Sequence, residues 1–194
     1  MATKNCITTL ASDILNDCNE QYGQGIEKTI YAISRNAIDF EASKREGHLI
    51  TNIQALAGSG NRGYKIGYPS SEVPAITVTD GNPAWGTSFD KVLPITLLAD
   101  SPKNAEAIMA LKSDKYVFIY ENTVKGETGD QAFPVIGWEQ GAVARDANLD
   151  KSSEESRGGW TVNITESKAQ TSQLFFFKTD YATTKAALES LCSE

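Results

Sequence analysis

Hydrophobic and polar residues alternate along most of the chain from Gly25 onward, and this two-residue period is typical of β-strands. Residues 27–35 give the first example. The two faces of that segment carry Ile30, Ala32 and Ser34 on one side, and Thr29, Tyr31, Ile33 and Arg35 on the other. Further strands are predicted at 48–56, 64–68, 75–79, 85–98, 116–120, 133–138, 141–145, 160–166 and 174–178.

Three segments depart from this alternation of hydrophobic and polar residues. Residues 116–120 are apolar throughout, which predicts a strand buried on both faces. Residues 37–40 are interpreted as a turn or a short edge piece. Residues 146–158 are polar and charged, which predicts an exposed loop.

Two segments carry helix signals instead. Ser101 can cap a helix whose first turn begins with Pro102, and this helix is expected over residues 101–112. Its apolar stripe is Ala105, Ile108, Met109 and Leu111. Asp180 can cap a C-terminal helix that continues through Leu191. Residues 8–18 fit either a short helix or an extended arm.

Strands therefore dominate, and helices do not alternate with them, which argues against a parallel α/β fold. The expected fold is mainly β: an antiparallel β-sandwich or half-open barrel with one packed helix and a C-terminal helix. We divide the chain into an N-terminal arm (1–24), a β domain (25–170) and a C-terminal strand and helix extension (171–194).

The amino-acid composition argues against several classes of function. The 194 residues carry a net charge of −7, which disfavours binding to nucleic acid phosphates. A single histidine, His48, and three scattered cysteines form no zinc or redox pattern, and the cysteines are expected to be free thiols. The chain has no secretory signal pattern and no apolar run long enough to span a membrane. No cofactor, metal or catalytic residue is predicted, and we expect no enzyme.

Candidate chemistry is sparse. Residues 58–63 match G-x-G-x-x-G, through Gly58, Gly60 and Gly63, with Arg62 between them. A strand is expected directly afterwards, so a mobile hairpin loop is favoured over a dinucleotide site, which needs a helix there. A nucleophile and base formed by His48 with Cys6 or Cys18 has no supporting motif. The acidic residues form a solvated loop or, less consistently, a calcium or glycosidase site: Glu139, Asp146, Asp150, Glu154 and Glu155.

Aromatic residues leave two interpretations open. The tryptophans and the phenylalanine triplet fit core or subunit-interface packing, and they also fit a sugar-binding surface: Trp85, Trp138, Trp160, Phe175, Phe176 and Phe177. Three consecutive phenylalanines in a strand point to both faces, so a sheet with one solvent-exposed face would expose some of them. A subunit interface there predicts that Phe176→Asp blocks assembly more than folding.

The order of several segments resembles tail-tube-like virion proteins of phages and prophages of Bacteroidota-type hosts. The segments are 18–26 with the strand 28–33, the helix around 104–108 with the strand 116–122, the turn 137–141, and the strand 158–165. The turn reads Gly137-Trp138-Glu139-Gln140-Gly141, similar to the family's glycine-x-glutamate-x-glycine turn. It continues with Ala142 where the family usually has leucine. Residues before 18 and after 170 are not matched.

This resemblance implies a virion structural protein, made in the bacterial host cytoplasm. Its copies would form a homo-oligomeric ring, often hexameric, and rings would stack into a tail tube or neck. DNA would pass as cargo through an acidic lumen without specific binding, and other tail or neck proteins would be partners. The 58–63 loop and the 1–24 arm would contact the next ring. The alternatives are a capsid decoration or fibre-base module and a carbohydrate-binding module.

Overall fold

The computed structural model describes residues 25–58, 60–67, 76–81, 87–98, 100–154 and 156–193, with two α-helices and eleven strands in these ranges. The first six strands are β1 Ile26–Ser34, β2 Lys44–Glu46, β3 Leu49–Asn52, β4 Gly63–Gly67, β5 Thr77–Asp80 and β6 Phe89–Leu97. The next five are β7 Tyr116–Asn122, β8 Pro134–Ile136, β9 Val143–Leu149, β10 Trp160–Ala169 and β11 Leu174–Phe176. The helices are α1 Pro102–Ser113 and α2 Tyr181–Leu191.

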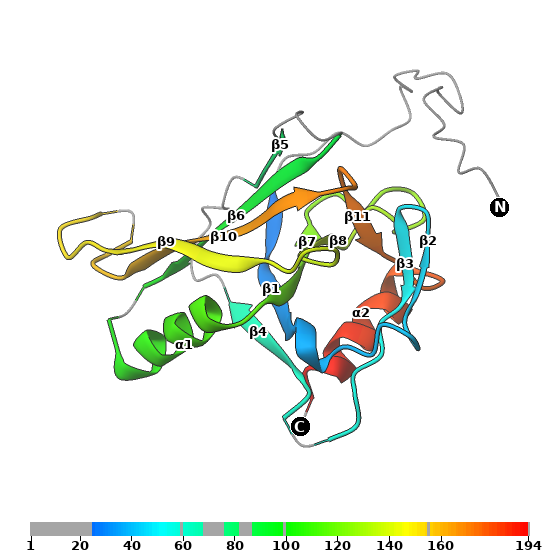
Figure 1. The fold of residues 1–194 in the computed structure, drawn as a ribbon, viewed down its shortest axis with the longest axis horizontal. Coiled ribbons are helices and arrows are strands. Elements are labelled where there is room, and N and C mark those ends of the chain that lie inside the picture. The colour runs from blue at the N-terminus through cyan, green and yellow to red at the C-terminus, as the bar shows by residue number, and fades with distance from the viewer. Residues whose placement is uncertain are drawn as a thin grey trace.

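The strands form two sheets (Figure 1). A seven-stranded sheet has the order β2-β3-β11-β8-β7-β1-β4, and a four-stranded sheet has the order β5-β6-β10-β9. All strand pairs are antiparallel except β3 with β11. Neither sheet closes into a barrel. The predicted fold class is thereby confirmed as a mainly β sandwich with one packed helix and a C-terminal helix.

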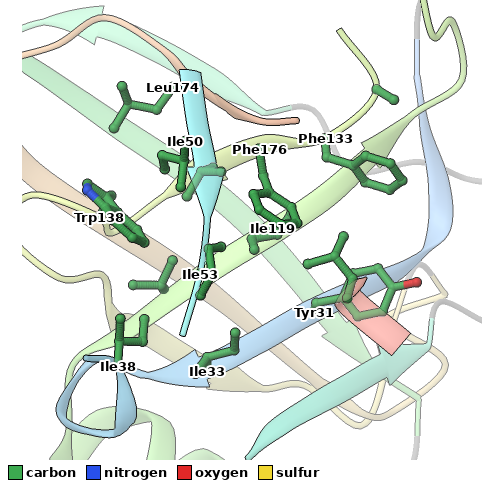
Figure 2. Packing of buried hydrophobic residues seen from close by; sticks show 14 of the residues in the cluster. Tyr31, Ile33, Ile38, Ile50, Ile53, Ile119, Phe133, Trp138, Leu174 and Phe176 are labelled. Carbon is green, nitrogen blue, oxygen red and sulfur yellow. The ribbon is translucent and has the colours of Figure 1, made fainter. Parts of the chain in front are cut away.

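The central strands of the seven-stranded sheet are buried on both faces, because they contribute alternate side chains to two cores. Ile30 and Ala32 of β1 join one core, and Tyr31 and Ile33 join the other. The inter-sheet core adds the inward residues of the four-stranded sheet, Leu93, Ile95, Val162 and Ile164. The outer core lies on the opposite face, where Leu188 of α2 packs with residues of the sheet that include Ile50 of β3. Figure 2 shows the buried side chains of this core. The expectation that 116–120 is buried on both faces is confirmed, since its residues divide between both cores.

Both helices begin where the sequence predicts. The hydroxyl of Ser101 accepts a hydrogen bond from the Asn104 N–H at 3.2 Å, and the carboxylate of Asp180 accepts one from the Thr183 N–H at 2.8 Å. These caps satisfy backbone donors that have no partner inside a helix. The predicted apolar stripe of α1 is only partly correct: Ile108 is buried, whereas Met109 is 66 % exposed.

The C-terminal helix is held on the sheet by polar contacts at both ends. Near its start, Tyr181 stacks on Phe133 with ring centroids 5.5 Å apart and donates a hydrogen bond to Glu121 at 2.5 Å. Near its end, Tyr31 donates a hydrogen bond to Glu189 at 2.8 Å. The extension beyond residue 170 therefore packs into the outer core together with the strands before it.

Some predicted boundaries are wrong. The strand β9 continues to Leu149, so part of the predicted loop 146–158 is strand. The strand β10 continues to Ala169, three residues beyond the predicted strand 160–166. The strand β2 was not predicted, because its three residues are all exposed and charged and so carry no apolar alternation. Residues 35–37 form a 3₁₀ turn, and Ile38 bridges to Ala55. Within the described ranges, neither helix is long and apolar enough to cross a membrane.

Candidate functional site

The turn between β8 and β9 is the most constrained polar feature of the described chain. Gly137 and Gly141 have φ angles of +89° and +78°, in the region that side chains rarely adopt. A Cβ on Gly137 would lie 2.2 Å from the carbonyl oxygen of Tyr116. This glycine is therefore required both for its backbone angle and for the close approach of β7.

The carboxylate of Glu166 closes this turn from the opposite sheet. Its Oε2 accepts a hydrogen bond from the Gly137 N–H at 2.9 Å, and its Oε1 accepts from the N–H groups of Glu139 and Gln140 at 3.2 and 3.1 Å. Convergent backbone N–H groups of this kind form an anion-binding concavity. Here the anion is a side chain of the same chain, so the turn is already filled.

Lys91 lies beside this carboxylate. Lys91 and Glu166 face each other in the register of β6 and β10, and the Lys91 Nζ is 3.4 Å from Glu166 Oε2. Both residues are buried, and the Lys91 Nζ makes no hydrogen bond. Removing one partner of such a buried pair typically costs about 3–5 kcal/mol, because the other is left uncompensated.

A second carboxylate anchors the outer side of the turn. Glu139 accepts hydrogen bonds from the backbone N–H groups of Gln170 and Thr171 at 2.7 and 3.1 Å, and from Arg45 at 2.8 Å. Burial raises the pKa of Glu139, but the hydrogen bonds from Thr171, Arg45 and the two amides outweigh burial and hold that pKa below its ordinary value. The expectation that Glu139 belongs to a solvated acidic loop is wrong.

Aromatic and cationic side chains cover the same turn. Arg35 donates a hydrogen bond to the Glu139 carbonyl at 3.2 Å, and its guanidinium lies 4.6 Å from the ring centroid of Phe40. Phe40 in turn packs edge-on against Trp138, with centroids 5.0 Å apart. The turn is thus held by two carboxylates and covered by a cation and two rings.

The candidate interface residues separate into two groups. Trp138 and Phe176 are buried in the outer core of a single chain (Figure 2), so they expose little surface to a partner. Phe175, Phe177 and Trp160 are half-buried. Trp85 lies outside the described residues.

Trp160 lines an apolar pocket of about 230 Å³ between α1 and the four-stranded sheet, together with Ala105, Ile108, Met109, Lys112 and Ala147. Its indole N–H is buried near the Asp100 carboxylate and contributes to lowering the pKa of Asp100, after the larger effect of Lys151, yet it makes no well-formed hydrogen bond. The pocket offers apolar contact and one lysine.

The glycine loop is followed by a strand, as predicted, and no helix begins there. Gly58 and Gly60 have positive φ angles, whereas Gly63 already belongs to β4. A Cβ on Gly63 would lie 2.7 Å from the Cys192 sulfur, so this glycine is covered by the end of α2 and does not belong to an exposed loop. Arg62 lies over the Tyr64 ring, 5.5 Å from its centroid.

The remaining candidate residues are dispersed. His48 Nδ1 is 2.8 Å from the Gln173 carbonyl oxygen, while Cys6, Cys18 and Glu155 lie outside the described residues. Asp150 caps the turn after β9 by accepting a hydrogen bond from the Ser152 N–H. In the part of the chain that the structure describes, no three His, Cys, Asp or Glu side chains are grouped to hold a metal ion.

Sequence reasoning missed Lys91 and Glu166, although a signal was present. Lys91 continues the inward phase of Leu93 and Ile95, and Glu166 continues that of Val162 and Ile164. A charged residue in the phase of a core face predicts a buried ion pair.

Comparisons of this chain with protein-family models, with curated proteins and with solved structures gave no match.

Proposed function

We propose that this chain is a virion structural protein, a ring-forming subunit of a phage tail tube or neck. The sequence resemblance at residues 18–166 motivates the proposal, and the open edges of both sheets support it. Within the described ranges, the sheets end at the edge strands β2 and β4, and β5 and β9. Edge strands present unpaired backbone groups, and pairing with a neighbouring copy would satisfy them.

The strand β5 carries this argument best. All four of its residues, Thr77–Asp80, are exposed, and Val78 is 40 % exposed. This four-residue strand ends in the charged Asp80, but it contains no lysine, proline or bulge, which are other features that protect an edge from pairing. Its β-branched residues favour an extended partner. A second copy of the chain paired at β5 would extend the four-stranded sheet across the subunit boundary.

Charge supports the passage of DNA without binding. The chain carries a net charge of −7, and residues 98–194 contribute five of the seven excess negative charges. A channel wall of this sign would repel phosphates and allow DNA to slide. Other tail or neck proteins would be the remaining partners. Of the candidate interface residues, the half-buried Phe175, Phe177 and Trp160 are still able to contribute to contacts.

Light scattering and negative-stain imaging of the purified chain test the proposal. We expect rings or tubes whose fraction rises with concentration. A protein that stays strictly monomeric at high concentration would refute ring formation. Rings that occur in native particles only on the capsid or at a fibre base would favour the decoration module instead.

A backbone variant tests the contact itself. Gly81 N–H donates to the Ser88 carbonyl at 2.7 Å, and antiparallel pairs alternate, so the N–H of Val78 points away from β6. Val78→Pro removes this outward donor and leaves the bonds to β6, whereas Val78→Thr keeps the donor. We expect rings from Val78→Thr and monomers from Val78→Pro. Rings from both variants would exclude pairing at β5.

The carbohydrate-binding alternative loses its main support. It requires exposed tryptophan beside Glu139, and the neighbouring Trp138 is buried. Stacking on a sugar needs an accessible ring face.

A further inference from the structure

The Lys91 side chain is a primary amine held in an unusual place. Its exposed fraction is 0 %, and its Nζ makes no hydrogen bond. An ammonium group has three N–H donors, and leaving them without acceptors in the interior is costly. The Glu166 Oε2, 3.4 Å away, is the only ion-pair partner that the described residues provide for this nitrogen. This contact is too long and too poorly aligned to be a hydrogen bond.

The neighbouring carboxyl group is oriented by the turn at Gly137. Two backbone N–H groups, from Glu139 and Gln140, point at Oε1, while Oε2 lies on the Lys91 side and accepts from Gly137. Two amides that converge on one oxygen are the arrangement that stabilises the oxyanion of a tetrahedral intermediate. The oxygen that faces the amine is the other one.

The two groups are also held in position. They form a register pair on β6 and β10, the two central strands of the four-stranded sheet. Both side chains are about 1 % exposed, so bulk water has almost no access. Fixed neighbours of this kind react with effective molarities of about 10⁵ M or more when they are well oriented.

We propose that Lys91 and Glu166 condense to an intramolecular amide bond. The ammonium first passes a proton to the carboxylate, giving an amine and a carboxylic acid. The lone pair of Nζ then forms a bond to Cδ of Glu166, and the negative charge on Oε1 is stabilised by the amides of Glu139 and Gln140. Collapse breaks the Cδ–Oε2 bond, and Oε2 leaves as water with the proton that Nζ loses. One ammonium and one carboxylate become one amide and one water, with no other reactant.

The product changes the polar contacts of this site in two ways: the Gly137 N–H loses its Oε2 acceptor, and both charges of the ion pair disappear. It removes both buried charges and leaves a single N–H in place of three. The remaining oxygen keeps the two amide donors of the turn. The bond would join the strands of the four-stranded sheet covalently, and it does not depend on whether the chain forms a tube.

The intact mass of the purified full chain tests the bond directly. We expect the wild type, denatured after incubation at physiological temperature, to be lighter than its sequence by one water. Lys91→Met should have the full mass of its sequence. Glu166→Gln lacks the carboxylate that takes the ammonium proton, so it should also have the full mass of its sequence.

Peptide mapping distinguishes this bond from dehydration elsewhere, such as at Asp80-Gly81. Trypsin should fail to cleave after Lys91, and one linked peptide should join segments of β6 and β10. A wild-type mass equal to the sequence, or complete cleavage after Lys91, would overturn the proposal even if neither variant folds. A water loss that persists in Lys91→Met would also overturn it.

Discussion

Truncation of Phe176 provides the sharpest check of the outer core. Its side chain is 1 % exposed and packs with Ile50, Ile119 and Leu174 in the cluster beneath α2 (Figure 2). A buried phenylalanine removes roughly 150 Å² from water, which at about 25 cal/mol per Å² corresponds to about 4 kcal/mol. Measured costs of such truncations lie at about 3–5 kcal/mol, since a cavity is left behind. We therefore expect Phe176→Ala to remove much of a typical stability of about 5–15 kcal/mol.

Urea unfolding followed by circular dichroism measures this loss. With a slope of about 2 kcal/mol per M, the midpoint should fall by about 2 M while the slope stays the same. The matched control is Phe175→Ala, because Phe175 is half-buried and points to the other face of β11. The control should lower the midpoint by less than half as much.

A Phe176→Ala variant within about 1 kcal/mol of the wild type would contradict the burial argument. That result would again favour Phe176 as a residue of a subunit interface. The burial of Phe176 also changes the outcome expected for Phe176→Asp, which the sequence predicts to block assembly more than folding. A carboxylate in this core has no partner, so the variant should fail to fold. Recovery of a folded, monomeric Phe176→Asp protein would show that this side chain lies between subunits.

Three further predictions concern the turn and a helix cap. Gly47→Ala, at φ +60° in open space, should cost about 1–2 kcal/mol in thermal or urea unfolding. Gly137→Ala should cost clearly more than this control, because its Cβ would also collide with the Tyr116 carbonyl; equal costs would contradict the close approach. Glu139→Gln should be less stable than the wild type by about 1.5–3 kcal/mol at pH 7. The pKa of Glu139 is lower in the folded than in the unfolded chain, so its carboxylate stabilises the fold at pH values above the unfolded pKa of about 4.3. This stabilisation is lost as the pH falls through the folded pKa. A stability difference between wild type and Glu139→Gln that does not shrink in acid would refute this assignment. Ser101→Ala should cost about 1 kcal/mol through loss of the α1 cap, and Ser101→Asp should retain the stability. An Ala variant as stable as the wild type would show that the cap is not needed.

The sequence alone determined the local elements wherever a periodic signal was strong. The caps at Ser101 and Asp180 mark both helices, and the two faces of residues 27–35 correspond to the two cores. These features depend on neighbours within a few residues, so a linear pattern carries them. The strand β2 has no such pattern, because it is an exposed charged edge whose pairing to β3 depends on its partner.

Contacts between groups far apart in the chain are visible only in the folded protein. The sequence predicted a strand at 174–178, of which Leu174–Phe176 forms β11, but not that α2 would cover one face and bury Phe176 within the chain. Sequence also could not place Glu166 in the turn at Gly137, 29 residues away, or place Lys91 beside it. Strand order and register set these contacts. The pairing of β6 with β10 sets the Lys91 contact, and the stacking of the two sheets sets the contact of Glu166 with the turn. Residue spacing along the chain specifies neither.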